Sequence, residues 1–125
     1  MASHDEQLPL GYTPDWIALG IVSAADIRRD ERDAATSDDP HPEHYRWRAF
    51  SRFLSEQRTL SPLLAQQFYA LGAADADPST GSSMMAAVLR HPDCPAAVLQ
   101  SGLASDQPHL QRIATQRLNP NDRSA

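Results

Sequence analysis

The chain has 125 residues, of which 41% are hydrophobic and 22% charged, and this predicts one globular domain over residues 1–125 with a hydrophobic core. A single cysteine and a net charge of −5 exclude an intramolecular disulfide and a metal site built from several cysteines, and they disfavour phosphate binding. No run approaches the ~20 apolar residues that cross a bilayer, and residues 1–10 lack the apolar stretch of a secretory signal, so we expect a cytoplasmic protein.

Helix start signals punctuate the N-terminal part of the chain. Thr13-Pro14 predicts a short helix that ends near Gly20, because a hydroxyl cap followed by proline is typical of a first helical turn. Ser23 and Asp26 resemble a capping box and predict a second helix to about residue 35. Ile27 is the main apolar anchor of that helix, so we expect the helix to lie on the outside of the domain with its charged side chains in water. Residues 1–12 are expected to form a flexible tail.

Two strongly patterned helices follow, from about residue 41 to 57 and from about 62 to 72. Apolar residues recur in both at helical spacing, which predicts a buried stripe on each. Arg48 and Arg52 step by four along the other side of the first, as in a solvated ladder. The predicted core residues are Trp47, Phe50, Leu54, Leu64, Phe68 and Leu71.

The remaining chain predicts a loop and three short helices. Residues 73–83 are rich in Ala, Asp, Ser and Gly and are typical of a loop, followed by helices over about 83–90, 95–103 and 107–118. Residues 119–125 are expected to be a second flexible tail. No segment alternates with a period of two, so we predict an all-α fold: a compact bundle of six or seven short helices whose C-terminal part stacks like an α-solenoid.

The C-terminal third contains a weak internal repeat. The segment 87–93 resembles 114–121 with one inserted residue, and the two prolines, Pro92 and Pro120, lie 28 residues apart. With Val88-Leu89-Arg90-His91-Pro92-Asp93-Cys94-Pro95, Val98-Leu99 and Leu103-Ala104-Ser105-Asp106, this segment resembles the leucine-rich repeat variant family of HEAT-like α-helical repeats. The resemblance implies stacked helices and a protein-binding role. The iron–sulfur centre of some members does not carry over, because Cys94 stands alone.

Two clusters could carry chemistry. His41, Glu43 and His44 offer metal-binding groups, but they lie across a helix start without a His-x-x-x-His pair, so the spacing favours a helix entry over a metal. His91 and Cys94 are separated by proline in a turn, which disfavours a nucleophilic pair. We therefore expect no cofactor, no metal and no enzymatic activity.

Aromatic and basic residues alternate over residues 45–52, a pattern that some nucleic-acid-binding proteins share. On a helix these side chains point in different directions. We expect the aromatic side chains to lie in the core and the arginines at its solvated edge. The net charge of −5 also opposes phosphate binding. We expect no direct contact with nucleic acid and none with a membrane.

Charge is unevenly spread and motivates a functional hypothesis. Residues 1–44 hold ten acids and three bases, whereas residues 45–125 hold six acids and eight bases, all of them arginine. An acidic surface suits a basic protein partner. The expected contacts are Asp26, Asp30, Glu31, Asp33, Asp38, Asp39 and Glu43, with Tyr12 and Trp16 as exposed aromatic anchors.

These features favour a stoichiometric protein-binding module, most specifically a bacterial immunity or antitoxin-type protein that occludes a toxin with a basic surface. The alternative is a small helical adaptor or scaffold that binds a partner through its helical stack. An enzyme is the third class, and it requires His41, Glu43 and His44 to meet residues distant in sequence.

Overall fold

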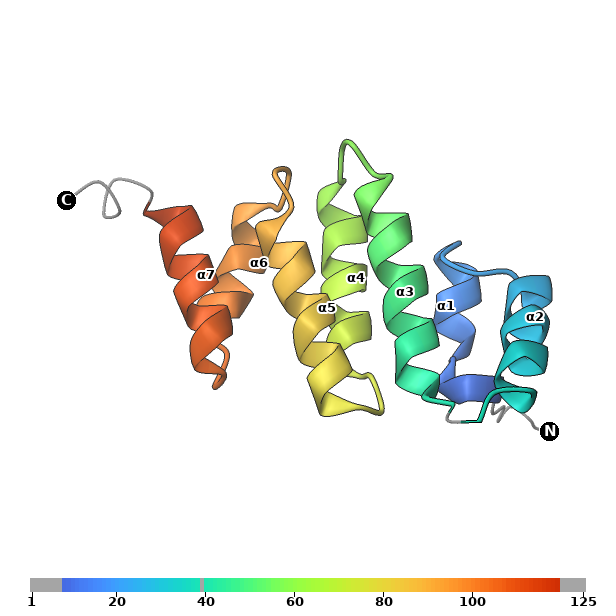
Figure 1. Ribbon diagram of the computed structural model, residues 1–125. Helices are drawn as coiled ribbons and strands as arrows, with labels where there is room; N and C mark the ends of the chain where they lie inside the picture. Colours follow the sequence, from blue (N-terminus) through green and yellow to red (C-terminus); the bar gives the residue numbers. More distant parts are fainter. Residues whose placement is uncertain (1–7, 39, 120–125) are drawn as a thin grey trace, which may run out of the picture. The chain divides into compact units, whose positions relative to one another are not determined.

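The computed structural model describes residues 8–38 and 40–119, and these contain seven α-helices and one short 3₁₀ helix (Figure 1). No strand occurs in these two ranges, so the predicted all-α class is confirmed. The chain divides into two compact units, residues 1–55 and 56–125, which are described separately. That the whole chain behaves as one domain stays a prediction. The elements are η2 (Pro9–Gly11), α1 (Pro14–Ala18), α2 (Ala24–Ala35), α3 (Pro42–Ser55), α4 (Pro62–Ala73), α5 (Pro78–Arg90), α6 (Ala96–Leu103) and α7 (Pro108–Leu118).

Side-chain caps fix where several helices begin. Ser23 and Asp26 form the expected capping box at α2: the Ser23 hydroxyl accepts from the Asp26 N–H at 3.0 Å, and the Asp26 carboxylate accepts from the Ser23 N–H at 2.9 Å. The Ser61 hydroxyl caps α4 by accepting from the Leu64 N–H at 3.2 Å. These caps satisfy backbone donors that have no partner inside a first helical turn.

The core of the N-terminal unit is built on three aromatic rings. Tyr12 and Trp16 pack edge-on with ring centroids 5.1 Å apart, and Trp16 meets Phe50 of α3 at 6.2 Å. The prediction that Tyr12 and Trp16 are exposed is wrong, since they are only 2% and 1% exposed. A helix as short as α1 gains most of its stability by burying large side chains against its neighbours.

Part of the predicted N-terminal tail is ordered. Residues 8–12 contain η2, which packs on α2 and α3, so the tail prediction is wrong for this stretch, while residues 1–7 lie outside the described part. The Arg46 guanidinium is buried and donates to the Leu10 carbonyl at 2.6 Å. Gly11 has φ +79°, and a Cβ there would overlap this guanidinium. Glycine is therefore required for the close approach.

The buried stripe of α3 is shifted from the predicted one. Phe50 and Leu54 are buried as expected, but Trp47 is 36% exposed, and Arg46 takes the position one turn before Phe50. The prediction of a core Trp47 is wrong because the buried Arg46 has its own partner at Leu10, which sets the rotation of the helix. In α4, Phe68 and Leu71 are buried as predicted, whereas Leu64 is half-buried.

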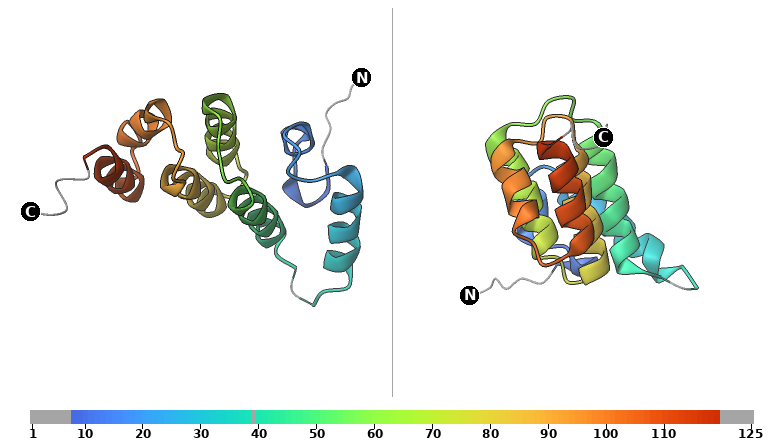
Figure 2. Two further views of the ribbon diagram at one scale, coloured as in Figure 1. Left: turned by 90° about the horizontal axis from the view of Figure 1, so that it is seen from above. Right: turned by 90° about the vertical axis from the view of Figure 1, so that its left-hand side faces the viewer.

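The C-terminal unit consists of two helix pairs, α4–α5 and α6–α7, arranged in two layers (Figure 2). The first and second pairs meet through α4 against α6 and α5 against α7, which is the stacking expected of an α-solenoid. Met84, Leu89 and Leu110 are fully buried between the layers. The predicted stacking of this part is confirmed.

Helix α5 begins earlier than its composition predicts. The expected loop to Ser83 is wrong, because Asp77 caps the helix by accepting from the Thr80 N–H at 2.9 Å and Pro78 occupies the first turn. Gly81, which predicted a loop, lies inside the helix where α4 and α5 cross. A Cβ on Gly81 would overlap the Gly72 carbonyl, so a small residue is needed for this close packing.

The repeated turns of the C-terminal unit are tied together by hydrogen bonds. The Arg117 guanidinium of α7 donates to the Leu89 and His91 carbonyls at 2.7 and 3.0 Å, where α5 ends. The buried His91 ring accepts from the Asp93 N–H at Nδ1, so Nε2 carries the proton toward the Gln57 carbonyl at 2.6 Å. Carbonyl groups in the last turn of a helix have no N–H partner within that helix, and the Arg117 guanidinium supplies the missing donors.

Candidate binding groove between α2 and α3

A cavity of about 260 Å³ lies in the N-terminal unit between α2 and α3. It is lined from the α2 side by Val22, Asp26, Arg29, Asp30 and Asp33, and from α3 by Tyr45, Arg48, Ala49 and Arg52. We refer to these nine residues as the α2–α3 groove. The acids of α2 follow one another at i, i+4 and i+7, and Arg48 and Arg52 at i and i+4, so each helix turns one charged row toward the other.

Two of the three carboxylates are held in place by tyrosines. The Tyr12 hydroxyl donates to Asp30 at 3.1 Å, and the Tyr45 hydroxyl donates to Asp33 at 2.5 Å. Burial, together with the negative charge of Asp30, raises the pKa of Tyr12 above its usual 10.0, and the hydrogen bond to Asp33 raises that of Tyr45. Both tyrosines therefore stay protonated and keep donating at neutral pH.

The third carboxylate belongs to the cap of α2. Asp26 accepts from the Ser23 N–H and pairs with the Arg29 guanidinium at 3.3 Å, while Arg29 lies 4.0 Å from Asp30. The hydrogen bond from the Ser23 backbone is the main cause that lowers the pKa of Asp26. The α2 wall is thus a row of three carboxylates, each of which is held by a hydrogen bond.

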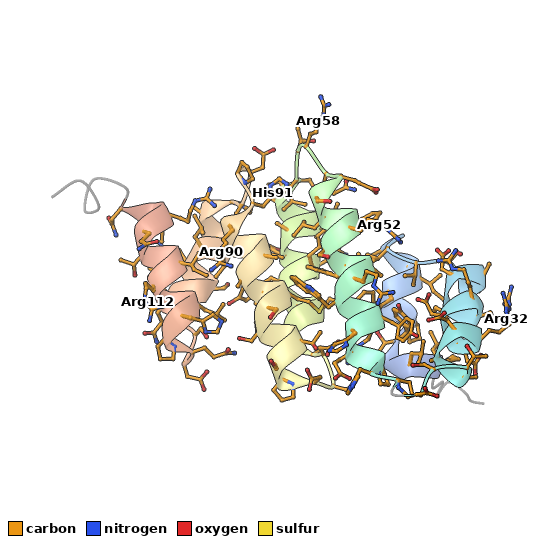
Figure 3. All side chains as sticks on the ribbon, in the orientation of Figure 1. Arg32, Arg52, Arg58, Arg90, His91 and Arg112 are labelled. Carbon is orange, nitrogen blue, oxygen red and sulfur yellow. The ribbon has the colours of Figure 1, made fainter. Side chains whose placement is uncertain are left out.

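The opposite wall presents guanidinium groups. Arg48 lies over the Tyr45 ring, 5.2 Å from its centroid. Arg52, which is labelled in Figure 3, lies near the C-terminal end of α3. Within residues 8–38 and 40–119 neither Arg48 nor Arg52 pairs with a carboxylate. Each guanidinium has five N–H donors, so this wall keeps donors for an incoming group.

The groove can therefore receive two opposite charges at once. A basic group fits beside Asp30 and Asp33, and an acidic group fits against Arg48 and Arg52. Pockets for small molecules are mostly apolar and occupy roughly 300–1,000 Å³. This groove is smaller and walled mainly by charged side chains, so its size and chemistry suit one or two side chains of a larger partner.

The structure separates the predicted contact residues into three groups. Asp26, Asp30 and Asp33 line the groove; Asp33 is exposed, Asp26 and Asp30 are half-buried, and Asp30 and Asp33 accept hydrogen bonds from the two tyrosines. Glu31 and Asp38 are exposed, and Glu43 is half-buried at the start of α3. Asp39 lies outside the described residues, and Tyr12 and Trp16 belong to the core.

Sequence reasoning missed the α3 wall of the groove. The sequence alone predicts a solvated ladder at Arg48 and Arg52 and no site at Tyr45. The signal was present in the matching spacing of the acids on α2 and the arginines on α3, but only the packing of the two helices shows that these rows face each other.

A second cluster lies at the start of α3. The side chains of His41, Glu43 and His44 lie near one another, although their sequence spacing disfavours a shared site.

Cys94 in the C-terminal unit is 8% exposed, and burial raises the pKa of its thiol to about 11, so this thiol is a poor nucleophile. Among the helices that the structure describes, none has the length and hydropathy required to cross a bilayer.

No protein-family model, curated protein or solved structure matches the chain. The resemblance of the C-terminal third to the leucine-rich repeat variant family therefore stays a prediction.

Proposed function

We propose that this protein is a stoichiometric protein-binding module that holds a charged segment of its partner in the α2–α3 groove. The observation that carries the proposal is the pair of facing walls, with fixed carboxylates on α2 and the guanidinium groups of Arg48 and Arg52 on α3. Such fixed charges favour a partner that presents a basic and an acidic side chain at matching positions.

The most specific form of the proposal is a bacterial immunity or antitoxin-type protein that acts in the cytoplasm. The acidic residues 1–44 support it, because they suit a toxin with a basic surface, and Glu31 and Asp38 remain exposed on this side of the chain. In this proposal the protein works without cofactor or catalysis, by covering the partner's active surface. It contacts neither nucleic acid nor membrane.

The test is affinity capture from the native host, followed by mass spectrometry and binding kinetics. The Arg48→Ala/Arg52→Ala variant should bind the captured partner at least tenfold more weakly, since each charged pair contributes about 1.5 kcal/mol or more at a desolvated interface. The matched control is Arg28→Ala/Arg32→Ala, which removes the same charge from exposed positions outside the groove; Arg32 points away from α3 in Figure 3. This control should change affinity by less than about twofold.

Equal affinity of both variants would place recognition outside the groove. If the partner is a toxin, co-expression of the native chain should restore growth, and the groove variant should restore it poorly. A partner without toxicity that still depends on Arg48 and Arg52 would retain the binding proposal and remove the immunity form of it.

The adaptor alternative is favoured by one observation in the C-terminal unit. Helices α4 and α6 contain no charged residue, and they expose Leu63 and Leu103, which are 66% and 37% exposed. A contiguous apolar patch marks a docking surface, and helices without charged residues can supply one. A Leu63→Glu/Leu103→Glu variant that loses the partner, while the groove variant keeps it, would select this alternative.

A further inference from the structure

Three metal-ligating side chains meet at the start of α3. One possible ligand atom each from His41, Glu43 and His44 lies within 4.8 Å of the others. The His41 Nδ1 and Glu43 Oε2 atoms are 3.6 Å apart, and the two imidazole centroids are separated by 4.8 Å with an interplanar angle of 35°. One atom from each of the three groups is therefore near enough to the others to approach the same ion.

The local backbone explains why residues spaced by three meet here. His41 directly precedes Pro42, the first residue of α3, and the His44 N–H donates to the His41 carbonyl at 2.9 Å. In a capping box, the residue before a helix and the third helical residue bring their side chains together in the same way. The i, i+4 spacing within a helix is therefore not needed for the two imidazoles to approach each other.

We propose that His41, Glu43 and His44 bind one Zn²⁺ ion. Two imidazole nitrogens and one carboxylate oxygen are typical zinc ligands, and three protein ligands leave a fourth position for water or a partner's side chain. Ligand atoms around a tetrahedral zinc lie about 3.4 Å apart, given bonds of about 2.1 Å. Both imidazoles are exposed and Glu43 is half-buried, which leaves room for side-chain rotation to bring the ligand atoms closer.

Charge around the site acts in two directions. The positive end of α3 opposes a cation, whereas Glu43 supplies a negative ligand and Asp38 precedes the site by three residues. Ion binding at this position ties the beginning of α3 to the end of the α2–α3 connection. The site shares no residue with the groove, so the zinc proposal is independent of the proposed function.

The test uses the full chain without a purification tag, titrated with Zn²⁺ alone by calorimetry at about pH 7.5. The expected result is one-to-one binding with a dissociation constant below about 100 μM. His41→Ala/His44→Ala should weaken binding at least tenfold, and Glu43→Gln at least threefold. Acidification to about pH 5.5 should also weaken it, because protons compete with zinc for the imidazole nitrogens.

The matched control is His4→Asn/His109→Asn, which removes two other histidines and should leave the dissociation constant unchanged within twofold. Circular dichroism checks that each variant keeps the helix content of the native chain; His41 and His44 are exposed, and Glu43 and His109 are half-buried. Binding weaker than about 1 mM, or equal binding by the native chain and the His41→Ala/His44→Ala variant, would overturn the proposal. So would loss of binding in the control variant.

Discussion

Single polar side chains determine how the N-terminal unit is arranged. Arg46 is 3% exposed and donates to the Leu10 carbonyl, and Tyr12 is 2% exposed and donates to Asp30. A buried polar group without a partner costs about 1–3 kcal/mol, so each of these residues favours one arrangement over others. Through them, the chain before α1 is joined to α2 and α3.

Replacing Tyr12 by phenylalanine tests the link to the groove. Tyr12→Phe removes the donor to Asp30 while keeping the ring that packs on Trp16, so we expect the free energy of unfolding to fall by about 1.5 kcal/mol. Urea denaturation followed by circular dichroism measures it. Tyr69→Phe is the matched control, because the Tyr69 hydroxyl makes no hydrogen bond within the described ranges, and it should change stability by less than about 0.5 kcal/mol.

The same residue predicts how stability responds to alkaline pH. Burial and the Asp30 charge raise the pKa of Tyr12 above 10.0 in the folded state, so the folded chain holds this proton more tightly than the unfolded chain does. Its contribution is full below pH 10 and is lost as the pH rises above that value. Urea midpoints measured from about pH 9 to 11 should fall less steeply in Tyr12→Phe than in the native chain. Parallel curves would contradict the assignment.

Two aromatic residues of α3 separate core from surface. Phe50 is 1% exposed and contacts Trp16, so Phe50→Ala should cost about 3–5 kcal/mol of unfolding free energy. Trp47 is 36% exposed, so Trp47→Ala should cost about 1 kcal/mol or less. Chemical denaturation of both variants measures the difference. Similar losses for the two residues would place Trp47 in the core, as its spacing alone suggests.

At the scale of helices, the sequence predicts the starts of α2 and α4 from their caps. The caps at Ser23 and Ser61 are local, since donor and acceptor lie within four residues, and both were predictable. The rotation of α3 depends on Arg46 reaching Leu10, 36 residues away, so the spacing of apolar residues places Phe50 and Leu54 correctly in the core but Trp47 wrongly. The α2–α3 groove was hidden for the same reason, because each row of charges also fits a solvated face.

The crossing of α4 and α5 depends on Gly81. Alanine is the better helix former by about 1 kcal/mol, but its Cβ would overlap the Gly72 carbonyl and push the helices apart. Gly81→Ala should therefore lower the free energy of unfolding by about 2 kcal/mol or more. Ser83→Ala, at an exposed position of the same helix, is the control and should stay within about 0.5 kcal/mol. Stabilisation by Gly81→Ala would show that the two helices do not pack this closely.

At the scale of the whole molecule, each of the two units has its own source of stability. The N-terminal unit contains 55 residues and depends on three aromatic rings and on hydrogen bonds between distant residues. Chains of this size bury only about 60% of the surface that they expose when unfolded. The C-terminal unit spans 70 residues and stacks repeated helix pairs, each of which packs mainly on its neighbours.

This difference predicts that residues 56–125 fold alone. Four of their core residues are fully buried: Phe68, Met84, Leu89 and Leu110. The hydrogen bonds of His91 and Arg117 also lie within this unit. The isolated segment should give a helical circular dichroism spectrum and unfold cooperatively on heating. A control segment, residues 56–106, lacks α7 and uncovers the α5 and α6 surfaces on which α7 packs, so it should lose cooperative unfolding. If residues 56–125 are unfolded alone while the full chain is folded, the C-terminal stack depends on residues 1–55, and the chain behaves as the single domain that its length predicts.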